Sequence, residues 1–360
     1  MAAHSPAYIF VLDQGSRQSP PLVPDPNTTS LIIDHHHATN LDFPADSSHV
    51  TACNSPPVAT SALLTYHICT PLHPSVPSLT AWLAIVGTHG DLGTTLKWQP
   101  PFPDMAETFK IHKKGTLNNV VSLINAPRRT PTYDVLSAWS ALTSPNAPTS
   151  ILTNPRLLAA KQEVQAEVAR CSHTAPSFSA DGKVAVFRIS SGAQIHPLIA
   201  TRWAGHLKSA VLEFVLVANE GYLEGKVNFS CRVARCAKAR DGDEPAVDII
   251  QSLKGYASLE PAAEEEPGKD PPPPPPTTSL LERVGEDFAR GHVQASGGIV
   301  GKAEFEELMG LMRVGVKKGA AAKQKEGGES SGTASNKKQK GGIIDSGQKN
   351  TLTSYFGKAT

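Results

Sequence analysis

The stretch LIIDHHHATN, residues 31–40, sets an apolar run directly before one aspartate and three histidines. A second apolar run, YIFVL at 8–12, ends in the same way, with Asp13 following it. Both runs are apolar on both faces, which is typical of parallel strands covered by helices on either side. Parallel strands end at one edge of their sheet, where open α/β sheets bind ligands. The two runs therefore predict a parallel α/β sheet that gathers Asp13, Asp34 and His35 at its carboxyl edge.

Two segments with helical spacing follow the strands, PPVATSALLTYHI at 56–68 and SLTAWLAIVGTHGD at 78–91, each with proline and serine or threonine near its start. The second segment supplies a further carboxylate, Asp91, beside glycines that would let the backbone approach a ligand closely. Aspartate oxygens are hard ligands and imidazole is borderline, so the combined set suits a divalent transition ion such as manganese. The plainer interpretation of one Asp-His-His run is a solvated turn, and convergence with Asp13 and Asp91 favours the metal site over it.

The alternation of strands and helices restarts near residue 183, after an amphipathic helical pattern at 154–171. Strand patterns at 183–189, 209–218 and 225–234 predict a second α/β unit. The acidic and proline-rich stretch at 260–276 is expected to be an extended solvated loop. Beyond it, residues 280–312 predict two helical segments around a glycine-rich turn. The domain boundaries predicted from these patterns are 1–150, a linker helix within 151–180, a second domain at 181–313 with a disordered insertion at 258–277, and a disordered basic tail at 314–360.

Composition excludes several classes of protein. The net charge is +1, so affinity for phosphates has to come from local clusters of charge. The five cysteines lack CxxC spacing, which indicates reduced thiols and neither a disulfide framework nor a zinc knuckle. No apolar run approaches the roughly 20 residues of a membrane span. We therefore expect a soluble intracellular protein with no membrane partner.

Several ordered segments together resemble the DHH phosphoesterase superfamily, which includes RecJ-type exonucleases, oligoribonucleases, exopolyphosphatases and manganese-dependent pyrophosphatases. The matching segments are VLDQGS (11–16), IIDHHHAT (32–39), VGTHGDLG (86–93), LINAPRRTP (123–131), NFSCR (228–232) and GHVQASGG (291–298). The last two are similar to the Ser-x-Arg strand and the glycine-histidine turn of the DHH-associated C-terminal domain. The resemblance covers roughly residues 7–312. It implies a DHH domain at 1–150 and the DHH-associated substrate-binding domain at 181–313.

Carried over by matched position, the resemblance implies a role for each site residue. Asp13 would bridge two metal ions, Mn²⁺ or alternatively Mg²⁺, and His35 and Asp91 would ligate one of them. Asp34 would orient its neighbours and His36 would contact the substrate phosphate, so these two are the predicted catalytic residues. His37 lies outside the motif and is interpreted as a polar turn residue. The predicted substrate-binding residues of the second domain are Arg232, Gly291, His292 and Gly297.

One family motif is missing. Relatives carry, upstream of the VLDQGS strand, a strand ending in His or Asn followed by paired aspartates, whereas only MAAHSPA stands here. His4 is isolated and has no neighbouring carboxylate. The pattern implies that one metal site keeps Asp13, His35 and Asp91, and that the other keeps only Asp13. Two hypotheses remain: an N-terminally incomplete form of an active enzyme, or a degenerate binding protein.

The C-terminal segment GQKNTLTSYFGKAT resembles a sliding-clamp interaction box. Leu352, Tyr355 and Phe356 stand at i, i+3 and i+4, so one helical turn would place all three on one face. Lys349 occupies the position of the box's glutamine, with Gln348 one residue earlier. The alternative is a frayed end with accidental apolar residues. Residues 313–340 are basic, which suits nuclear import or weak contact with nucleic acid, or alternatively a solubilising tail.

The functional hypothesis is a nuclear DHH-type protein that hydrolyses or binds single-stranded nucleic acid in DNA replication or repair, with the sliding clamp as a further partner. An exonuclease of this type would be manganese-dependent, although the missing motif leaves its activity open. The alternatives are a catalytically inactive DHH-fold scaffold for replication proteins, and a phosphoesterase for polyphosphate or short oligonucleotides.

Overall fold

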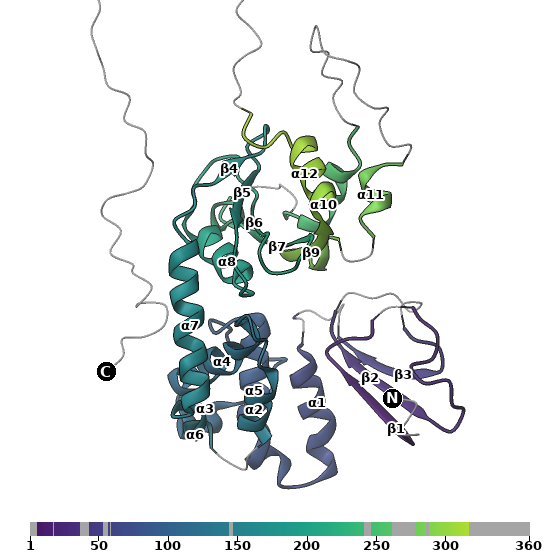
Figure 1. Cartoon of the computed structure of the whole chain (residues 1–360). Coiled ribbons are helices and arrows are strands. Elements are labelled where there is room, and N and C mark those ends of the chain that lie inside the picture. Colours follow the sequence, from purple (N-terminus) through teal and green to yellow (C-terminus); the bar gives the residue numbers. More distant parts are fainter. Residues whose placement is uncertain are drawn as a thin grey trace, which may run out of the picture.

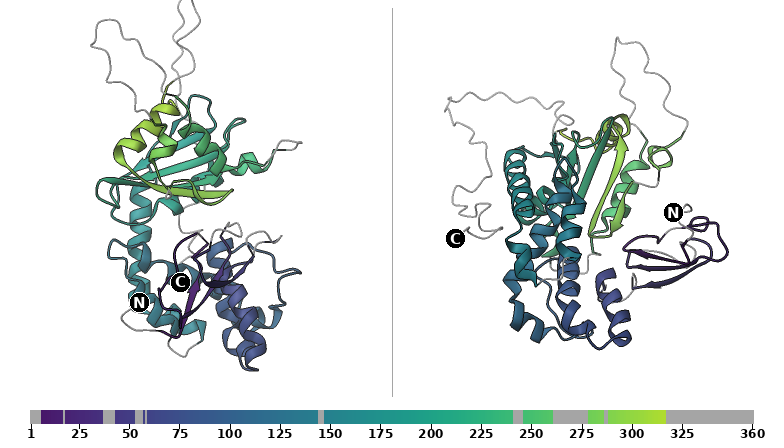
Figure 2. Two further views of the ribbon diagram at one scale, coloured as in Figure 1. Left: turned by 90° about the vertical axis from the view of Figure 1, so that its right-hand side faces the viewer. Right: turned by 60° about the horizontal axis from the view of Figure 1, so that its bottom comes forward.

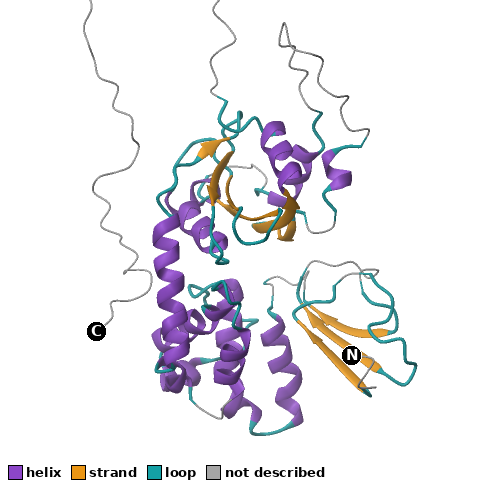
Figure 3. Cartoon of the chain, in the orientation of Figure 1, coloured by secondary structure: helices purple, strands orange, loops and turns teal. Residues whose placement is uncertain are grey.

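The chain folds into a small parallel sheet, a helical region and a larger mixed sheet (Figure 1). The helical region and the larger sheet lie along one long helix, and the small sheet stands to the side. The computed structural model describes residues 6–16, 18–36, 43–52, 57, 59–143, 147–240, 246–260, 278–285 and 288–316. Figure 3 separates the helices from the two sheets by colour. The predicted mixed α/β class with a parallel sheet is confirmed.

The N-terminal sheet has the order β1 (Tyr8–Leu12), β2 (Thr29–Asp34) and β3 (Ser47–Thr51), and all of its strands are parallel. Its register pairs Leu12 with Ile33, so β1 and β2 end side by side. Ile32 and Ile33 are buried, which fixes β2 in the centre of the sheet. The two predicted strands are therefore adjacent, and their carboxyl ends share one edge.

One expectation for this sheet was wrong. Strand β1 is covered on one face only, because Tyr8, Phe10 and Leu12 are 69%, 66% and 49% exposed, whereas Ile9 between them is buried. The sheet stands to one side of the helical region, beyond helix α1 (Figure 1). Apolar residues on both faces of a strand record only composition, and the position of the strand in the assembled fold decides which face meets a helix.

Helices α1 (Ser61–Cys69) and α2 (Val76–Leu92) follow the sheet and correspond to the two predicted helical segments. A core of buried side chains that includes Ile85, Leu117 and Leu157 joins them to the helices that follow. Those helices were not predicted from the sequence. They are α3 (Ala106–His112), α4 (Lys114–Asn125), α5 (Val135–Thr143) and α6 (Pro148–Leu152), with short 3₁₀ turns at Thr70–Leu72 and Pro127–Arg129.

Helix α7 (Pro155–Cys171) runs from the helical region to the second sheet (Figure 2). It begins where Asn154 accepts hydrogen bonds from the backbone N–H groups of Arg156 and Leu157, and proline at the first helical position needs no such partner. Its buried face, at Leu157, Ala160, Val164 and Val168, recurs with helical spacing. The helix lies within the segment predicted to be a linker, and the predicted domain boundaries themselves stay a prediction.

The second sheet has the strand order β4-β5-β6-β7-β9-β8, in which only β5 and β6 pair in parallel. Its strands are β4 (Ser177–Phe178), β5 (Val184–Ile189), β6 (Phe214–Asn219), β7 (Lys226–Val233), β8 (Arg290–His292) and β9 (Ala295–Gly301). Helix α8 (His196–His206) packs on one face, and α10 (Ile249–Ala257) and α12 (Lys302–Leu311) pack on the other. Short helices α9 (Arg235–Lys238) and α11 (Leu280–Arg283) complete the unit.

The segment at 280–312 contains the two predicted helical parts, α11 and α12, but the part between them differs from its prediction. Its glycine-rich part forms the β8–β9 hairpin, and β9 adds to the sheet beside β7. Glycines lower the strand propensity of this stretch, so its sequence did not predict strands β8 and β9. At Gly297 the reason for glycine is contact, because a Cβ there would lie 2.5 Å from the carbonyl oxygen of Phe229 on β7.

Several predicted features lie outside the described residues: His4, His37, the insertion from 261 to 277, and the tail from 317 onward, including its clamp-box residues. Within the described part of the chain, no helix is both long enough and apolar enough to span a membrane. Cys69, Cys171, Cys231 and Cys236 are free thiols, as expected for reduced cysteines.

Candidate metal and phosphate site

Asp13 and His35 meet where β1 and β2 end. The backbone N–H of Asp13 bonds to the carbonyl oxygen of Ile33 (2.9 Å), extending the strand pairing by one residue. Asp13 then adopts a left-handed backbone conformation, with φ of 63°, which turns the chain away from the sheet. Aspartate tolerates this region better than most residues. The side chain of Asp13 is thereby left at the sheet edge, 64% exposed.

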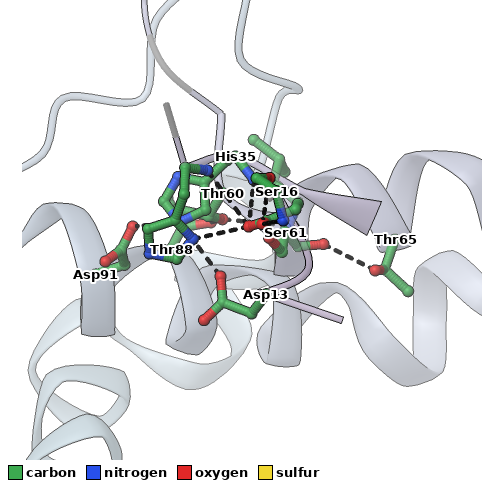
Figure 4. Close-up of polar contacts among 11 residues, drawn as sticks. Asp13, Ser16, His35, Thr60, Ser61, Thr65, Thr88 and Asp91 are labelled. Carbon is green, nitrogen blue, oxygen red and sulfur yellow. Dashed lines mark hydrogen bonds and ion pairs between the residues drawn. The ribbon is translucent and has the colours of Figure 1, made fainter. Parts of the chain in front are cut away.

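His35 is the centre of the site (Figure 4). Its Nε2 atom lies 3.3 Å from Oδ1 of Asp13 and 3.3 Å from Oδ2 of Asp91, and its side chain is 1% exposed. Its other ring nitrogen, Nδ1, is buried and has no hydrogen-bond partner among the described residues. Two carboxylates therefore converge on one imidazole nitrogen.

Asp91 reaches the site from the last turn of α2 and not from a strand end. Of the glycines around it, Gly87 has a packing role, and the predicted approach of backbone to ligand stays a prediction. A Cβ at Gly87 would lie 2.4 Å from Cβ of Ala62, so glycine there lets α1 and α2 pack closely. The nearest atom to a Cβ at Gly90 would be a side-chain nitrogen of Asn125, at 3.7 Å.

Asp34 is buried and organises its neighbours without facing Asp91. Its Oδ2 accepts hydrogen bonds from the backbone N–H and hydroxyl of Ser16. Its Oδ1 accepts from the backbone N–H of His35 (2.8 Å) and lies 2.8 Å from Nδ1 of His36. Burial alone would raise the pKa of Asp34, but the hydrogen bonds from His36 and Ser16 lower it well below its usual range. Asp34 is therefore ionised, and it fixes the ring of His36 and the backbone of His35.

His36, just after β2 of the N-terminal sheet, stacks on His292, on β8 of the second sheet. Residues 6–143 and 147–316 are called the two halves of the molecule. The rings of His36 and His292 are 5.7 Å apart at an interplanar angle of 11°, and His35 lies 5.5 Å from His292. The hydrogen bond to Asp34 raises the pKa of His36 despite burial. Burial lowers the pKa of His292, and the nearby His35, His36 and Arg232 add to that effect. The pKa values of the two imidazoles are therefore shifted in opposite directions, although Asp91 opposes the shift of His292.

The start of α1 also faces the site and was not predicted to belong to it. Thr60 caps the helix by accepting a hydrogen bond from the N–H of Leu63, and its hydroxyl lies 3.0 Å from that of Thr88 on α2. Burial would raise the pKa of Asp13, but the contact with His35 lowers it overall. The serine and threonine just before an apolar helix were the sequence signal for this cap.

Arg232 lies half-buried on β7, and its Nη1 donates hydrogen bonds to the hydroxyl of Ser230 and to the carbonyl oxygen of Cys231. Sequence analysis missed the groups around it, Arg129 and His196. Burial lowers the pKa of Arg129 to about 9, with Arg128 and Arg232 contributing. Burial lowers the pKa of His196 to about 3, with Arg129 and Arg232 contributing.

No ion pair to Arg129 or Arg232 occurs among the described residues, and Nδ1 of His196 is buried without a partner there. Two half-buried guanidinium groups with no carboxylate between them carry an uncompensated desolvation cost that an anion would offset. This cluster of Arg129, His196 and Arg232 is suited to a phosphate group.

The predicted glycines of the second domain lie beside this cluster. Gly291 has φ of 107°, and a Cβ there would come within 2.6 Å of the carbonyl oxygen of Ala295. Gly297 is paired with residues of both β7 and β8. Close packing of the hairpin accounts for glycine at both positions, and their contact with substrate stays a prediction.

The donor set fits a divalent ion. Asp13, His35 and Asp91 offer two carboxylates and one imidazole, a mixture that suits Mn²⁺ or Mg²⁺ better than a thiol-preferring metal. Ligand atoms of Asp13, Asp34 and His36 also lie within 4.8 Å of one another, as do those of His35, His36 and His292. However, both oxygens of Asp34 are already engaged in hydrogen bonds, which leaves Asp13 as the available carboxylate on that side.

Comparison with solved structures places this geometry in a known fold. The structure is similar to the DHH domain of a member of the s1p family of ribosomal proteins, with a TM-score of 0.53 and 12% identity, covering 85% of this chain and 68% of that one. Exonuclease RecJ bound to manganese gives a TM-score of 0.46 at 16% identity, covering 86% and 75%. RecJ from Thermus thermophilus with Mg²⁺ gives 0.42 at 15%, covering 79% and 42%.

No protein-family model matches the chain, and no curated protein matches it in sequence. The likeness to solved structures therefore establishes architecture and leaves substrate and activity to the site itself. The chain shares the fold of a DHH-domain protein.

Proposed function

We propose that this protein is a DHH-type phosphoesterase or phosphodiester-binding protein that acts on single-stranded nucleic acid with a divalent metal ion, Mn²⁺ or Mg²⁺. The observation that carries the proposal is the position of His35 Nε2, 3.3 Å from both Asp13 and Asp91. Solved RecJ structures contain manganese or magnesium, which supports the choice of ion.

Asp13, His35 and Asp91 would hold the ion, which when bound lowers the pKa of water and neutralises phosphoryl charge. Asp34 fixes the two histidines through its hydrogen bonds. His36, whose pKa is raised, would donate a hydrogen bond to a phosphate oxygen. Arg129, Arg232 and His292 would bind the neighbouring phosphates of the same strand.

The second candidate function is a catalytically inactive scaffold that binds nucleic acid or replication proteins. It is favoured by the donor count, because Asp13 is the only carboxylate free to serve a second ion among the described residues at the β1–β2 edge. A protein with one ion can hold a phosphodiester without activating water as a two-ion site does.

Metal binding is tested by titrating Mn²⁺ into the full chain in a calorimeter. Asp13→Ala and His35→Ala each remove a ligand and should weaken Mn²⁺ affinity strongly. His73→Ala is the control, because His73 is exposed and its ring bonds only to Ser75. Equal affinity in the wild type and both site variants would disprove the metal site.

Hydrolysis separates the two candidates. A labelled single-stranded oligonucleotide is incubated with the full chain and Mn²⁺, beside His35→Ala. Products that depend on His35 identify a hydrolase. Binding of the oligonucleotide without His35-dependent products identifies a binding protein.

Two further elements of the proposal rest on sequence. Leu352, Tyr355 and Phe356 would bind a sliding clamp, and the basic segment 313–340 would direct the protein to the nucleus. Together they support a role in DNA replication or repair. The alternative substrate is polyphosphate or a short oligonucleotide, which would use the metal and arginine residues but have no need of the tail.

A further inference from the structure

Beyond the arginine cluster, aromatic side chains flank the junction of the two halves of the molecule. The halves are tied there by a hydrogen bond from the backbone N–H of Gln194 to the carbonyl oxygen of Arg129 (2.9 Å). A Cβ at Gly192 would lie 3.7 Å from the ring of Pro131. The loop at 127–133 and the start of α8 are therefore in direct contact.

Tyr133, at the end of this loop, has an unusual backbone conformation. Its φ is 49°, a left-handed backbone that is strained for a bulky residue, and its side chain is 55% exposed. Hydrogen bonds hold the loop in place, from the N–H of Tyr133 to Thr130 (3.0 Å) and from the N–H of Asp134 to Pro127 (3.1 Å). The fold thus stabilises a strained backbone that presents an aromatic ring to solvent without burying it.

Tyr222 approaches from the other half, in the turn between β6 and β7. Its ring lies 6.5 Å from that of His196, a member of the arginine cluster. Arg128 is exposed beside them, with its Nε donating to Asn125 Oδ1 (3.0 Å). A Cβ at Gly221, the residue before Tyr222, would lie 2.7 Å from the backbone nitrogen of Ser191. The turn that carries Tyr222 and the loop that carries Arg128 and Tyr133 therefore contact the same segment, 190–192. Burial raises the pKa of Tyr222, Tyr133 raises it further and Arg128 opposes the rise.

The aromatic residues connect to the metal site through the sheet. Arg232 on β7 pairs with Ala295 on β9, and Ala295 pairs with His292 on β8. His292 in turn stacks on His36. The side chains therefore follow one another outward from the candidate metal site. His36 and His292 come first, the arginine cluster next, and Tyr222, Arg128 and Tyr133 last.

We propose that Tyr133, Tyr222 and Arg128 form a nucleobase-binding subsite, in which a base of a single-stranded nucleic acid stacks while its phosphate lies at the arginine cluster. The subsite rests on the proposed function, because it takes a strand whose phosphates occupy the metal and arginine positions. Aromatic faces bind bases of any sequence, and a guanidinium group beside them adds both stacking and charge. A polyphosphate has no group to fill this subsite.

The experiment measures binding of two labelled oligonucleotides by fluorescence anisotropy, without added metal so that neither is cleaved. One carries thymine at every position, and the other has the same phosphates with abasic sugars. Tyr133→Leu and Tyr222→Leu should each weaken binding of the thymine strand by roughly five- to a hundred-fold and leave the abasic strand unchanged. Tyr133→Phe and Tyr222→Phe keep the ring and should bind as the wild type does.

Tyr8→Leu is the matched control, because Tyr8 is an exposed aromatic residue on β1. Competition by tripolyphosphate should be equal in all variants, which also shows that each remains folded. If the leucine variants bind both strands as the wild type does, or the wild type binds both strands equally, the subsite is refuted while the proposed function stands. If the wild type binds neither strand nor tripolyphosphate, the proposed function fails and the subsite with it.

Discussion

His196 couples the stability of this protein to pH. It is 5% exposed, and burial beside Arg129 and Arg232 lowers its pKa to about 3, against about 6.5 in an unfolded chain. Between these two values the unfolded state binds a proton that the folded state does not. Stability contributed by neutral His196 is therefore present above pH 6.5 and is lost as the pH falls towards 3.

We expect the free energy of unfolding to fall between pH 7.5 and pH 5.5, and to fall less in His196→Gln, whose amide does not titrate. The difference should be about 1 kcal/mol, because one group contributes about 1.4 kcal/mol per pH unit below its unfolded pKa. Urea denaturation at both pH values measures it. The same fall in both proteins would show that folding does not lower the pKa of His196.

Asp34 is expected to affect metal binding without being a ligand. Its oxygens are occupied by Ser16, His35 and His36, so it would act on the metal through the orientation of the histidines. Asp34→Asn replaces one acceptor oxygen with a donor and should weaken Mn²⁺ binding by roughly 10- to 100-fold. Calorimetry checks this beside His35→Ala, whose loss should be larger. A loss in Asp34→Asn as large as that in His35→Ala would make Asp34 a direct ligand.

The contact between α1 and α2 positions two parts of the site at once, the start of α1 and Asp91 at the end of α2. Gly87→Ala would place its Cβ 2.4 Å from Ala62 and force the helices apart. Overpacking of this kind costs about 1–3 kcal/mol, and the better helix propensity of alanine offsets about 1 kcal/mol of it. We expect lower thermal stability and weaker Mn²⁺ binding together.

Gly205→Ala is the matched control, because Gly205 also lies in a helix, α8, and a Cβ there meets nothing within 4 Å. That variant should be as stable as the wild type or up to about 1 kcal/mol more stable. Thermal unfolding compares the two variants. A stable Gly87→Ala protein with unchanged metal affinity would show that the helices adjust without moving the site.

For the molecule as a whole, the proposed clamp box adds a second point of attachment. A peptide of residues 345–360 has few apolar side chains and pays ordering entropy on binding, so its affinity should be micromolar or weaker, about −8 kcal/mol at most. Replacing Tyr355 and Phe356 with alanine should abolish it. Titration of both peptides against a sliding clamp is the measurement, and coincident curves would leave 345–360 without a clamp-binding role.

Much of the candidate site could be predicted from the sequence, because its residues belong to short motifs at the ends of strands and helices. Asp13 and His35 follow apolar strands directly, and parallel pairing brings such positions together whatever the details of packing. Helix α7 was predictable because its apolar residues recur with helical spacing and its sequence begins with Asn-Pro. In these cases the local sequence pattern and the direction of the chain are sufficient to predict the structure.

Tertiary structure alone decided the rest. Arg129, His196 and Arg232 come from three separate elements. His196 and Arg232 meet where α8 packs on the second sheet, and Arg129 joins them where that unit contacts the helical region, so no local pattern records their proximity. The exposed face of β1 has the same composition as a buried one, and the glycines of β9 resemble a turn until β7 lies against them. Sequence determined which residues stand at the ends of strands and helices, because that depends on local periodicity. Docking of distant elements determined which of them share a site, because burial and contact depend on the whole fold.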